Sequence, residues 1–156
     1  MDFATIFRLE ENLNLDKKTL VILRWIAIFG QIFSINLVYF FLDLEFPVLL
    51  CHLVIFIGLI TNIYLQFGLK ATLLKDFYST SFLIYDIIQL GILLFLTGGI
   101  FNPFAILLIV PTIVSSTFLS MGSTIILGSS TIIILFFLTF FNMPLPGMEE
   151  YVLSFP

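Results

Sequence analysis

The sequence predicts an all-α fold, a polytopic membrane helix bundle with about five transmembrane helices and a cytoplasmic N-terminus. Of its 156 residues, 60% are hydrophobic and only 10% are charged, whereas a soluble domain carries about 25% charged residues. Long windows contain no charge, and about 20 mostly apolar residues suffice to cross a bilayer. All the Lys and Arg residues also fall on one side of a five-helix topology. Lipid is therefore the predicted solvent for most of the chain.

Five apolar stretches are long enough to be spans. Asp16 precedes the first stretch and is suited to cap its N-terminus, and Pro47 suits the first turn of the second. The connections between the stretches are short, so we expect neighbouring helices to pack antiparallel. The predicted spans cover about residues 20–42, 47–67, 79–97, 103–120 and 123–141.

The positive-inside rule predicts the orientation of these spans. It makes residues 1–19 a cytoplasmic segment, residues 20–141 the transmembrane bundle and residues 142–156 a non-cytoplasmic tail. The opposite side has acidic residues but no Lys or Arg. The basic residues are Arg8, Lys17, Lys18, Arg24, Lys70 and Lys75, and the acidic residues of the other side are Asp43, Glu45, Glu149 and Glu150.

The composition argues against two kinds of partner. No basic stripe exists, so nucleic acid is not expected to bind. The single cysteine, Cys51, and the single histidine, His52, cannot form a zinc pattern. We therefore expect no metal site.

The apolar pattern is interrupted at Gly98–Phe104, which reads GGIFNPF. One interpretation is structural. Glycine ends helices because it tolerates positive φ, Asn is a strong N-cap, and Pro fits the first helical position. Gly98 and Gly99 then end the third helix, and Asn102 and Pro103 begin the fourth.

The same segment is also suited to bind a ligand. A helix N-terminus presents free N–H groups and a partial positive charge. Asn102 adds an amide, Phe101 and Phe104 add flat apolar faces, and the two glycines allow close approach to the backbone. A quinone headgroup fits this description, with its tail in lipid. The residues alone leave both interpretations open.

Two stretches resemble the membrane sensor region of the RegB/PrrB redox-sensing histidine kinases of bacteria. GGIFNPF matches the family's Gly-Gly-x-x-Asn-Pro-Phe heptapeptide at every fixed position, and LVILRWIAIFGQ, Leu20 to Gln31, resembles the start of its first span. The resemblance implies that Gly98, Gly99, Asn102, Pro103 and Phe104 form an element responsive to ubiquinone.

The resemblance also implies partners and a location. It predicts a multi-pass protein of the bacterial inner membrane, a homodimer, whose cytoplasmic kinase portion signals to a response regulator. The family has six spans before the kinase, and this chain ends before the sixth. The family's phosphoacceptor His, ATP-binding glycines and redox-active Cys belong to the missing part, so Cys51 and His52 must not be mistaken for them. We predict no catalytic residue in this chain.

Polar residues within spans are costly and are functional candidates. Arg24 and Asp86 both lie near the cytoplasmic side. They could form an ion pair that braces two helices, Arg24 could instead reach the headgroups, or the two could relay protons. Gln89 is on the same helical face as Asp86 and could extend their network.

Two further residues are candidates, His52 in the second span and Pro111 in the fourth. His52 is either a satisfied buried histidine or a proton partner for reduced quinone. Pro111 removes a hydrogen bond to Leu107 and is predicted to kink the fourth helix.

The sequence supports two main functional readings. The first is a quinone-sensing and redox-sensing module of a two-component sensor kinase. The second is a membrane subunit of a transporter or respiratory enzyme, with Arg24, His52, Asp86 and Gln89 along a polar path. A third is a fragment that only anchors a missing domain.

Overall fold

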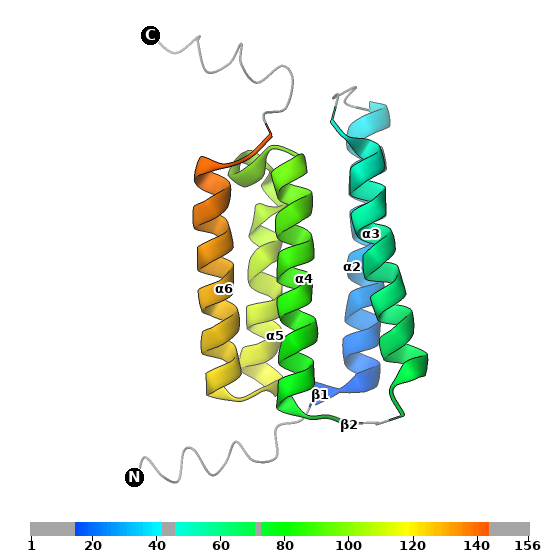
Figure 1. The fold of residues 1–156 in the computed structure, drawn as a ribbon, viewed down its shortest axis with the longest axis vertical. Coiled ribbons are helices and arrows are strands. Elements are labelled where there is room, and N and C mark those ends of the chain that lie inside the picture. Colours follow the sequence, from blue (N-terminus) through cyan, green and yellow to red (C-terminus); the bar gives the residue numbers. More distant parts are fainter. Residues whose placement is uncertain (1–14, 42–45, 71–72, 144–156) are drawn as a thin grey trace.

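The structure is a computed structural model that describes residues 15–41, 46–70 and 73–143. Five α-helices run side by side along its long axis (Figure 1). They are α2 (Lys17–Phe41), α3 (Val48–Ile63), α4 (Asp76–Leu96), α5 (Val110–Phe118) and α6 (Met121–Phe140). The predicted all-α bundle is confirmed.

Four helical stretches have the length and the apolar composition of a membrane span. The second of them consists of α3 and a π-helical turn, η2 (Tyr64–Gly68), that continues it. Large side chains on the outer surface are apolar and exposed, as a lipid-facing surface requires; Phe33 and Phe136 are examples, each 67% exposed. The four stretches are Lys17–Phe40, Val48–Gly68, Asp76–Leu96 and Met121–Phe140.

The start of α2 is tied to the connection before α4. Strand β1 (Leu15–Asp16) pairs antiparallel with strand β2 (Leu73–Leu74). The Asp16 carboxylate accepts a hydrogen bond from the Lys18 N–H at 3.2 Å, which confirms the predicted cap. Lys17 Nζ donates to the carbonyl oxygens of Gln66 at 3.2 Å and Leu69 at 2.6 Å, at the C-terminal end of η2.

The fourth span differs from the prediction of one α-helix over residues 103–120. It begins as a 3-10 helix, η4 (Pro103–Ile109), and becomes α-helical only in α5. Pro111 has no N–H, and the structure places it in the first turn of α5, where an N–H has no partner within the helix. The Leu107 carbonyl accepts from the Val110 N–H in the 3-10 pattern, so it does not need the α-helical hydrogen bond that Pro111 could not make.

The 3-10 geometry also affects the length of this span. A 3-10 helix rises about 2.0 Å per residue and an α-helix about 1.5 Å. The seven residues of η4 and the nine of α5 therefore extend over about 27 Å, close to the ~30 Å of a bilayer core. The fifth predicted helix also starts earlier, because Ser120 caps it and the predicted turn at Met121 and Gly122 is helical.

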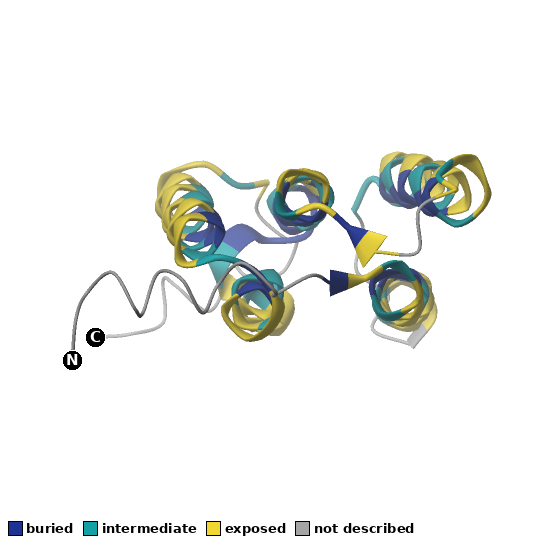
Figure 2. Cartoon of the chain, turned by 90° about the horizontal axis from the view of Figure 1, so that it is seen from below, coloured by how far each residue is buried: buried dark blue, intermediate teal, exposed yellow. Residues whose placement is uncertain are grey.

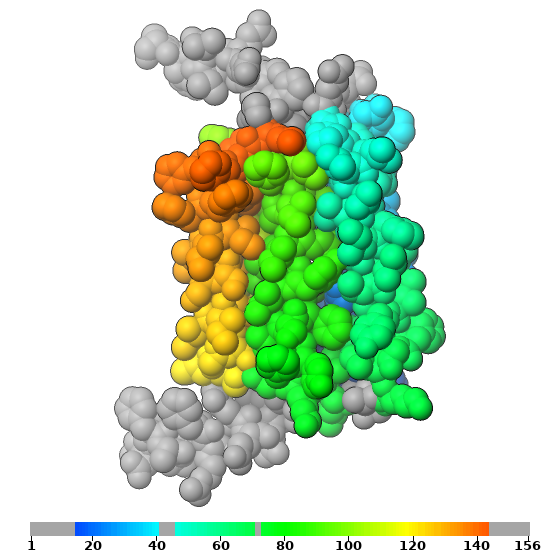
Figure 3. All heavy atoms as spheres, in the orientation of Figure 1, coloured from blue at the N-terminus to red at the C-terminus, as the bar shows by residue number. Residues whose placement is uncertain are grey.

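Helix α4 is central in the bundle. Seen along the helices, α2 and α3 form one pair, and α5 and α6 lie on the other side of α4 (Figure 2). Half of the apolar window of α4 is buried, against 22% to 28% for the other spans. Figure 3 shows α4 between α3 and α6 on the front face. Each side of α4 therefore has its own set of neighbours.

Candidate functional site

The GGIFNPF segment forms the turn that joins α4 to η4. Gly98 has φ 101° and Gly99 has φ 62°, in the left-handed region that glycine tolerates. A short 3-10 turn, η3 (Gly99–Phe101), follows, and Pro103 begins η4. The predicted structural role of the two glycines, Asn102 and Pro103 is confirmed.

The amide of Asn102 is engaged within the turn. Its Nδ2 donates to the Thr97 carbonyl oxygen at 3.0 Å and to Thr97 Oγ1 at 2.8 Å. Its Oδ1 accepts from the Phe104 N–H at 2.9 Å. The side chain therefore caps η4 and holds the end of α4 at the same time, and both of its N–H donors are occupied.

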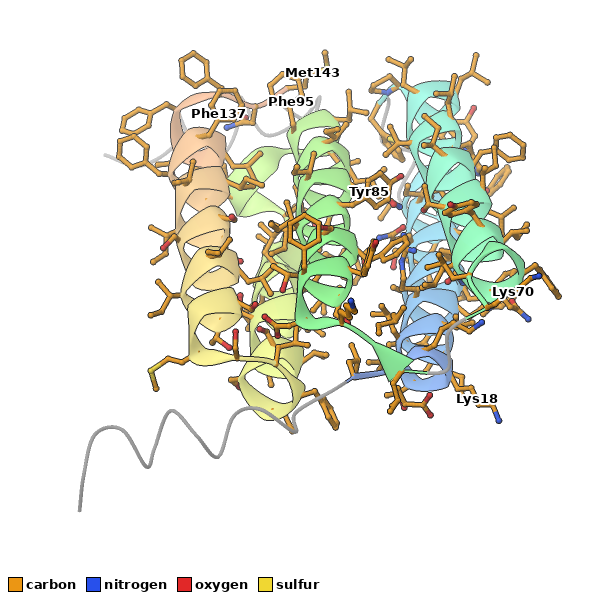
Figure 4. The ribbon with its side chains drawn as sticks, turned by 60° about the horizontal axis from the view of Figure 1, so that its bottom comes forward. Lys18, Lys70, Tyr85, Phe95, Phe137 and Met143 are labelled. Carbon is orange, nitrogen blue, oxygen red and sulfur yellow. The ribbon has the colours of Figure 1, made fainter. Side chains whose placement is uncertain are left out.

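The end of α6 packs beneath the turn. A Cβ at Gly99 would collide with the side chain of Asn142, so Asn142 takes the space that the sequence suggested for a close ligand. The Met143 N–H donates to the Phe95 carbonyl oxygen at 2.9 Å. The rings of Phe95 and Phe137 lie 6.4 Å apart, and Figure 4 shows these residues together at this end of the bundle.

The exposed surface of the turn is aromatic and apolar. Gly98 and Gly99 are buried, whereas Pro103 is exposed. Phe101 is 68% exposed and Phe104 is 39% exposed. Two flat rings and a proline thus form the accessible part of the heptapeptide.

An apolar groove of about 510 Å³ begins beside this turn and runs between η4–α5 and α6, which are in contact along its floor. The Thr112 and Thr131 hydroxyls lie 3.2 Å apart in it, and Thr131 Oγ1 donates to the Leu108 carbonyl oxygen at 3.2 Å. The groove depends on how two helices pack, so the sequence did not reveal it. It is lined by Ile100, Ala105, Ile106, Ile109, Thr112, Gly128, Thr131, Ile132 and Leu135.

Arg24 and Asp86 form the predicted ion pair between α2 and α4. Arg24 Nε and an Nη atom lie 3.0 Å from Asp86 Oδ1, and the same Nη donates to Thr61 Oγ1 at 2.8 Å. The guanidinium also faces the rings of Phe82 and Tyr85, 5.3 and 5.6 Å from its carbon. Arg24 is only 3% exposed, so it is held between helices and does not extend to the headgroups.

Gln89 also reaches α2, but through a different partner. Its Nε2 donates to Gln31 Oε1 at 3.1 Å. Its amide packs against Gly58 of α3, where a Cβ would collide with it. Gln89 therefore makes a second polar contact between α4 and α2, beside the Arg24–Asp86 pair.

His52 makes its polar contacts with α2 and with its own helix, and none with the heptapeptide turn among the described residues. Its Nδ1 is 2.9 Å from the Val48 carbonyl oxygen and its Nε2 is 3.4 Å from Asn36 Nδ2. The turn packs against α6 instead. The candidate residues therefore occupy three places: the turn, the Arg24–Asp86 pair and His52.

Sequence reasoning missed Asp76, at the opposite end of α4 from the turn. Its carboxylate accepts hydrogen bonds from the Ser120 N–H at 3.0 Å, from Ser120 Oγ at 2.8 Å and from Ser123 Oγ. An anion thus lies at the N-terminus of α6, where the helix dipole favours it. An acidic residue in the first turn of α4 indicates a role at a helix N-terminus. That the helix would be α6, far along the chain, was not predictable from spacing.

The fold and the candidate site define a class of protein. Its outer surface is largely apolar, and polar side chains such as Arg24, Gln89 and Thr131 are buried between helices that match membrane spans. No group of three or more His, Cys, Asp or Glu residues that could hold a metal ion occurs in the described ranges. The protein is a polytopic α-helical membrane protein.

A comparison with known proteins narrows this class. Over 140 residues, 89% of the chain, it is 36% identical to "Sensor histidine kinase RegB" of Cereibacter sphaeroides. The chain spans 30% of the length of that kinase. No protein-family model matches the chain, and neither does any solved structure. The similarity confirms the resemblance to the RegB membrane sensor region that the sequence suggested.

Proposed function

We propose that this bundle is the sensor module of a membrane-bound histidine kinase and that it responds to the redox state of a quinone at the Gly98–Phe104 turn. The kinase portion of the same protein and its response regulator receive the signal. The module lies in the bacterial inner membrane, works as a homodimer and has its N-terminus in the cytoplasm. The similarity to a sensor histidine kinase supports the kinase part of the proposal.

The observation that carries the quinone assignment is the accessible surface of the turn. Phe101 and Phe104 expose flat rings on which a quinone ring can stack, with ring centroids about 4.5–7 Å apart in favourable aromatic pairs. Asn102 has both N–H donors occupied, so its role here is to hold the backbone that presents these rings.

The charges support the proposed orientation. Lys17 and Lys18 begin α2, and Lys70 and Lys75 precede α4 at the same end, as the pairing of β1 with β2 requires. Figure 4 shows Lys18 and Lys70 at that end. The heptapeptide turn follows α4 and therefore lies at the opposite end, which the positive-inside rule assigns to the non-cytoplasmic side.

The turn contacts elements that can pass on a signal. Its backbone continues from α4 through Thr97, and Asn142 connects it to the end of α6. Binding that differs between the two redox states would shift the equilibrium between two packings of these helices. The reading as a transporter or respiratory subunit has less support, because Arg24 with Asp86 and Gln31 with Gln89 are paired with each other.

The test uses a full-length kinase that carries this sensor region, reconstituted in nanodiscs. Ubiquinone and its reduced form are titrated against autophosphorylation. The variants are Asn102→Ala, which removes the support of the turn, and Phe101→Leu with Phe104→Leu, which removes the stacking faces. Phe33→Leu is the control, because Phe33 is as exposed as Phe101 but lies on α2.

We expect Asn102→Ala and the double Phe variant to lose the response to quinone while basal autophosphorylation persists. Phe33→Leu should respond like the unmodified protein. An unchanged response in both turn variants would remove the assignment of the turn as the quinone site. A response that Phe33→Leu also loses would point to a general effect on the membrane surface.

A further inference from the structure

The groove between η4–α5 and α6 has the shape of a channel open to the outside of the bundle. Its floor is buried, since Thr131 is 5% exposed, and its rims are open, since Ile106 is 74% and Ile132 is 69% exposed. In a membrane its opening faces the lipid acyl chains. Its volume of about 510 Å³ falls within the range of about 300–1,000 Å³ that is typical of ligand pockets.

The chemistry of the walls favours a hydrocarbon occupant. All but two of the side chains that line the groove carry no polar atom. The two hydroxyls are already engaged, because Thr131 donates to the Leu108 carbonyl oxygen and Thr112 can donate to Thr131. A hydrocarbon chain needs no hydrogen-bond partner, so walls without a free polar group suit it.

The Thr131 hydroxyl is engaged because the Leu108 carbonyl lacks a 3-10 donor within its own helix. Leu107 accepts from the Val110 N–H in the 3-10 pattern of η4. The same pattern would pair Leu108 with the N–H of Pro111, which proline lacks. Thr131 of α6 supplies a donor to that carbonyl.

The groove continues from the heptapeptide. Ile100 belongs to the heptapeptide and Ala105 directly follows it, and both line the groove. On α6 the lining runs from Leu135 to Gly128, a distance of about 10 Å along the helix. A molecule whose ring lies on the turn can therefore place a linear tail in the groove.

We propose that this groove holds the isoprenoid tail of a quinone whose ring lies at the Gly98–Phe104 turn, an inference that rests on the proposed function. The tail is favoured over a separate acyl chain, because attachment to the bound ring raises its effective concentration at the groove. Lipid is as apolar as the groove, so the selectivity comes from van der Waals fit and not from the hydrophobic effect.

The test compares two probes on the full-length kinase in nanodiscs, at equal mole fraction in the lipid. One probe is a ubiquinone with a short isoprenoid tail, and the other is the tail-less dimethoxy-methyl-benzoquinone ring. Gly128→Phe fills the groove. Gly128→Ala is the matched control, since a Cβ there meets the Thr112 methyl at an ordinary 3.6 Å. Ala105→Phe fills the groove from the opposite wall.

We expect Gly128→Phe and Ala105→Phe to weaken binding of the tailed quinone about fivefold, because the tail loses packing contacts but keeps apolar surroundings. Binding of the tail-less ring should not change, and Gly128→Ala should behave like the unmodified protein. Binding of the ring also reports that each variant is folded.

A tailed quinone with a photoreactive group on its tail gives an independent readout. It should crosslink to residues 105–112 and 128–135. If the unmodified protein binds neither probe, the proposed function fails. If it binds both but the filled variants bind the tailed quinone normally, or the crosslinks fall on other helices, the groove assignment alone is overturned.

Discussion

The two sides of α4 differ in the polar side chains that make contacts between helices. Toward α2 and α3, α4 presents long side chains, Asp86 and Gln89, which meet Arg24 and Gln31. On the α5 and α6 side, the buried polar contacts are made mainly by short hydroxyls, such as the Thr112–Thr131 pair between those two helices. Long side chains bridge helices, whereas short hydroxyls and glycines let backbones approach closely.

This difference indicates which helices can change their packing when a ligand binds. The α2–α3–α4 face is held by an ion pair between the buried Arg24 and the partly buried Asp86, and separating these charges is costly. On the other side, Asp76 joins α4 to the start of α6, but between η4–α5 and α6 the polar contacts are neutral, beside an apolar groove and the heptapeptide turn. We therefore expect the first face to act as a fixed support and the second side to respond to a ligand.

The largest expected effect tests the fixed support. Asp86→Leu leaves the Arg24 guanidinium buried without its carboxylate, so we expect a loss of about 3–5 kcal/mol in the free energy of unfolding. Unfolding by denaturing detergent in mixed micelles measures it.

The matched control for this variant is the double substitution Arg24→Leu with Asp86→Leu. Replacing both charges by apolar residues should recover most of the loss, because no unpaired charge remains. If Asp86→Leu alone leaves stability unchanged, the pair is not the support of this face.

The second prediction concerns the turn on the responsive side. Gly99→Ala places a Cβ at φ 62° and against the side chain of Asn142, so we expect a loss of about 1–2 kcal/mol or more. The same detergent titration measures the change in unfolding free energy.

Gly30→Ala is its control. Gly30 lies in α2, and a Cβ there would meet nothing within 4 Å. Alanine is a better helix former than glycine by about 1 kcal/mol, so this variant should be as stable as the unmodified protein or more so. Equal losses in both variants would contradict the tight packing at Gly99.

The smallest expected effect distinguishes an interhelical hydroxyl from one that bonds within its own helix. Thr131→Val removes the donor to the Leu108 carbonyl and should cost about 0.6 kcal/mol and at most about 1.7 kcal/mol, the mean and the maximum found for interhelical hydrogen bonds in a membrane protein. Thr139→Val on the same helix should have little effect, because Thr139 is exposed and bonds only the Leu135 carbonyl in the turn before it. Indistinguishable unfolding midpoints for the two would show that Thr131 does not join the helices.

Several local features were predictable because they depend on neighbours in the chain. The glycine pair that ends α4, the cap at Asn102 and the cap at Asp16 are set by backbone preferences and short-range hydrogen bonds. The Arg24–Asp86 pair was predictable as well, since two opposite charges at similar depth in lipid have few other partners.

Other features were not predictable because their partners lie far along the chain. The Asn142 side chain reaches Gly99 only after α6 has packed beside α4, and Asp76 caps α6 for the same reason. The acidic residues predicted on the non-cytoplasmic side lie outside the described ranges, so the orientation remains a prediction.

The sequence by itself determined a bundle of membrane helices, the positions of most helix ends and the turn at Gly98–Phe104, because apolar length, charge placement and capping residues act locally. Only the tertiary structure decided that Asn102 is occupied within the turn, that His52 pairs with Asn36 of α2, and that a groove runs beside α6. The physical reason is that hydrogen-bond partners and empty volume depend on how the helices pack against one another. The helical period of 3.6 residues shows which side chains share a face, but not which helix that face will contact.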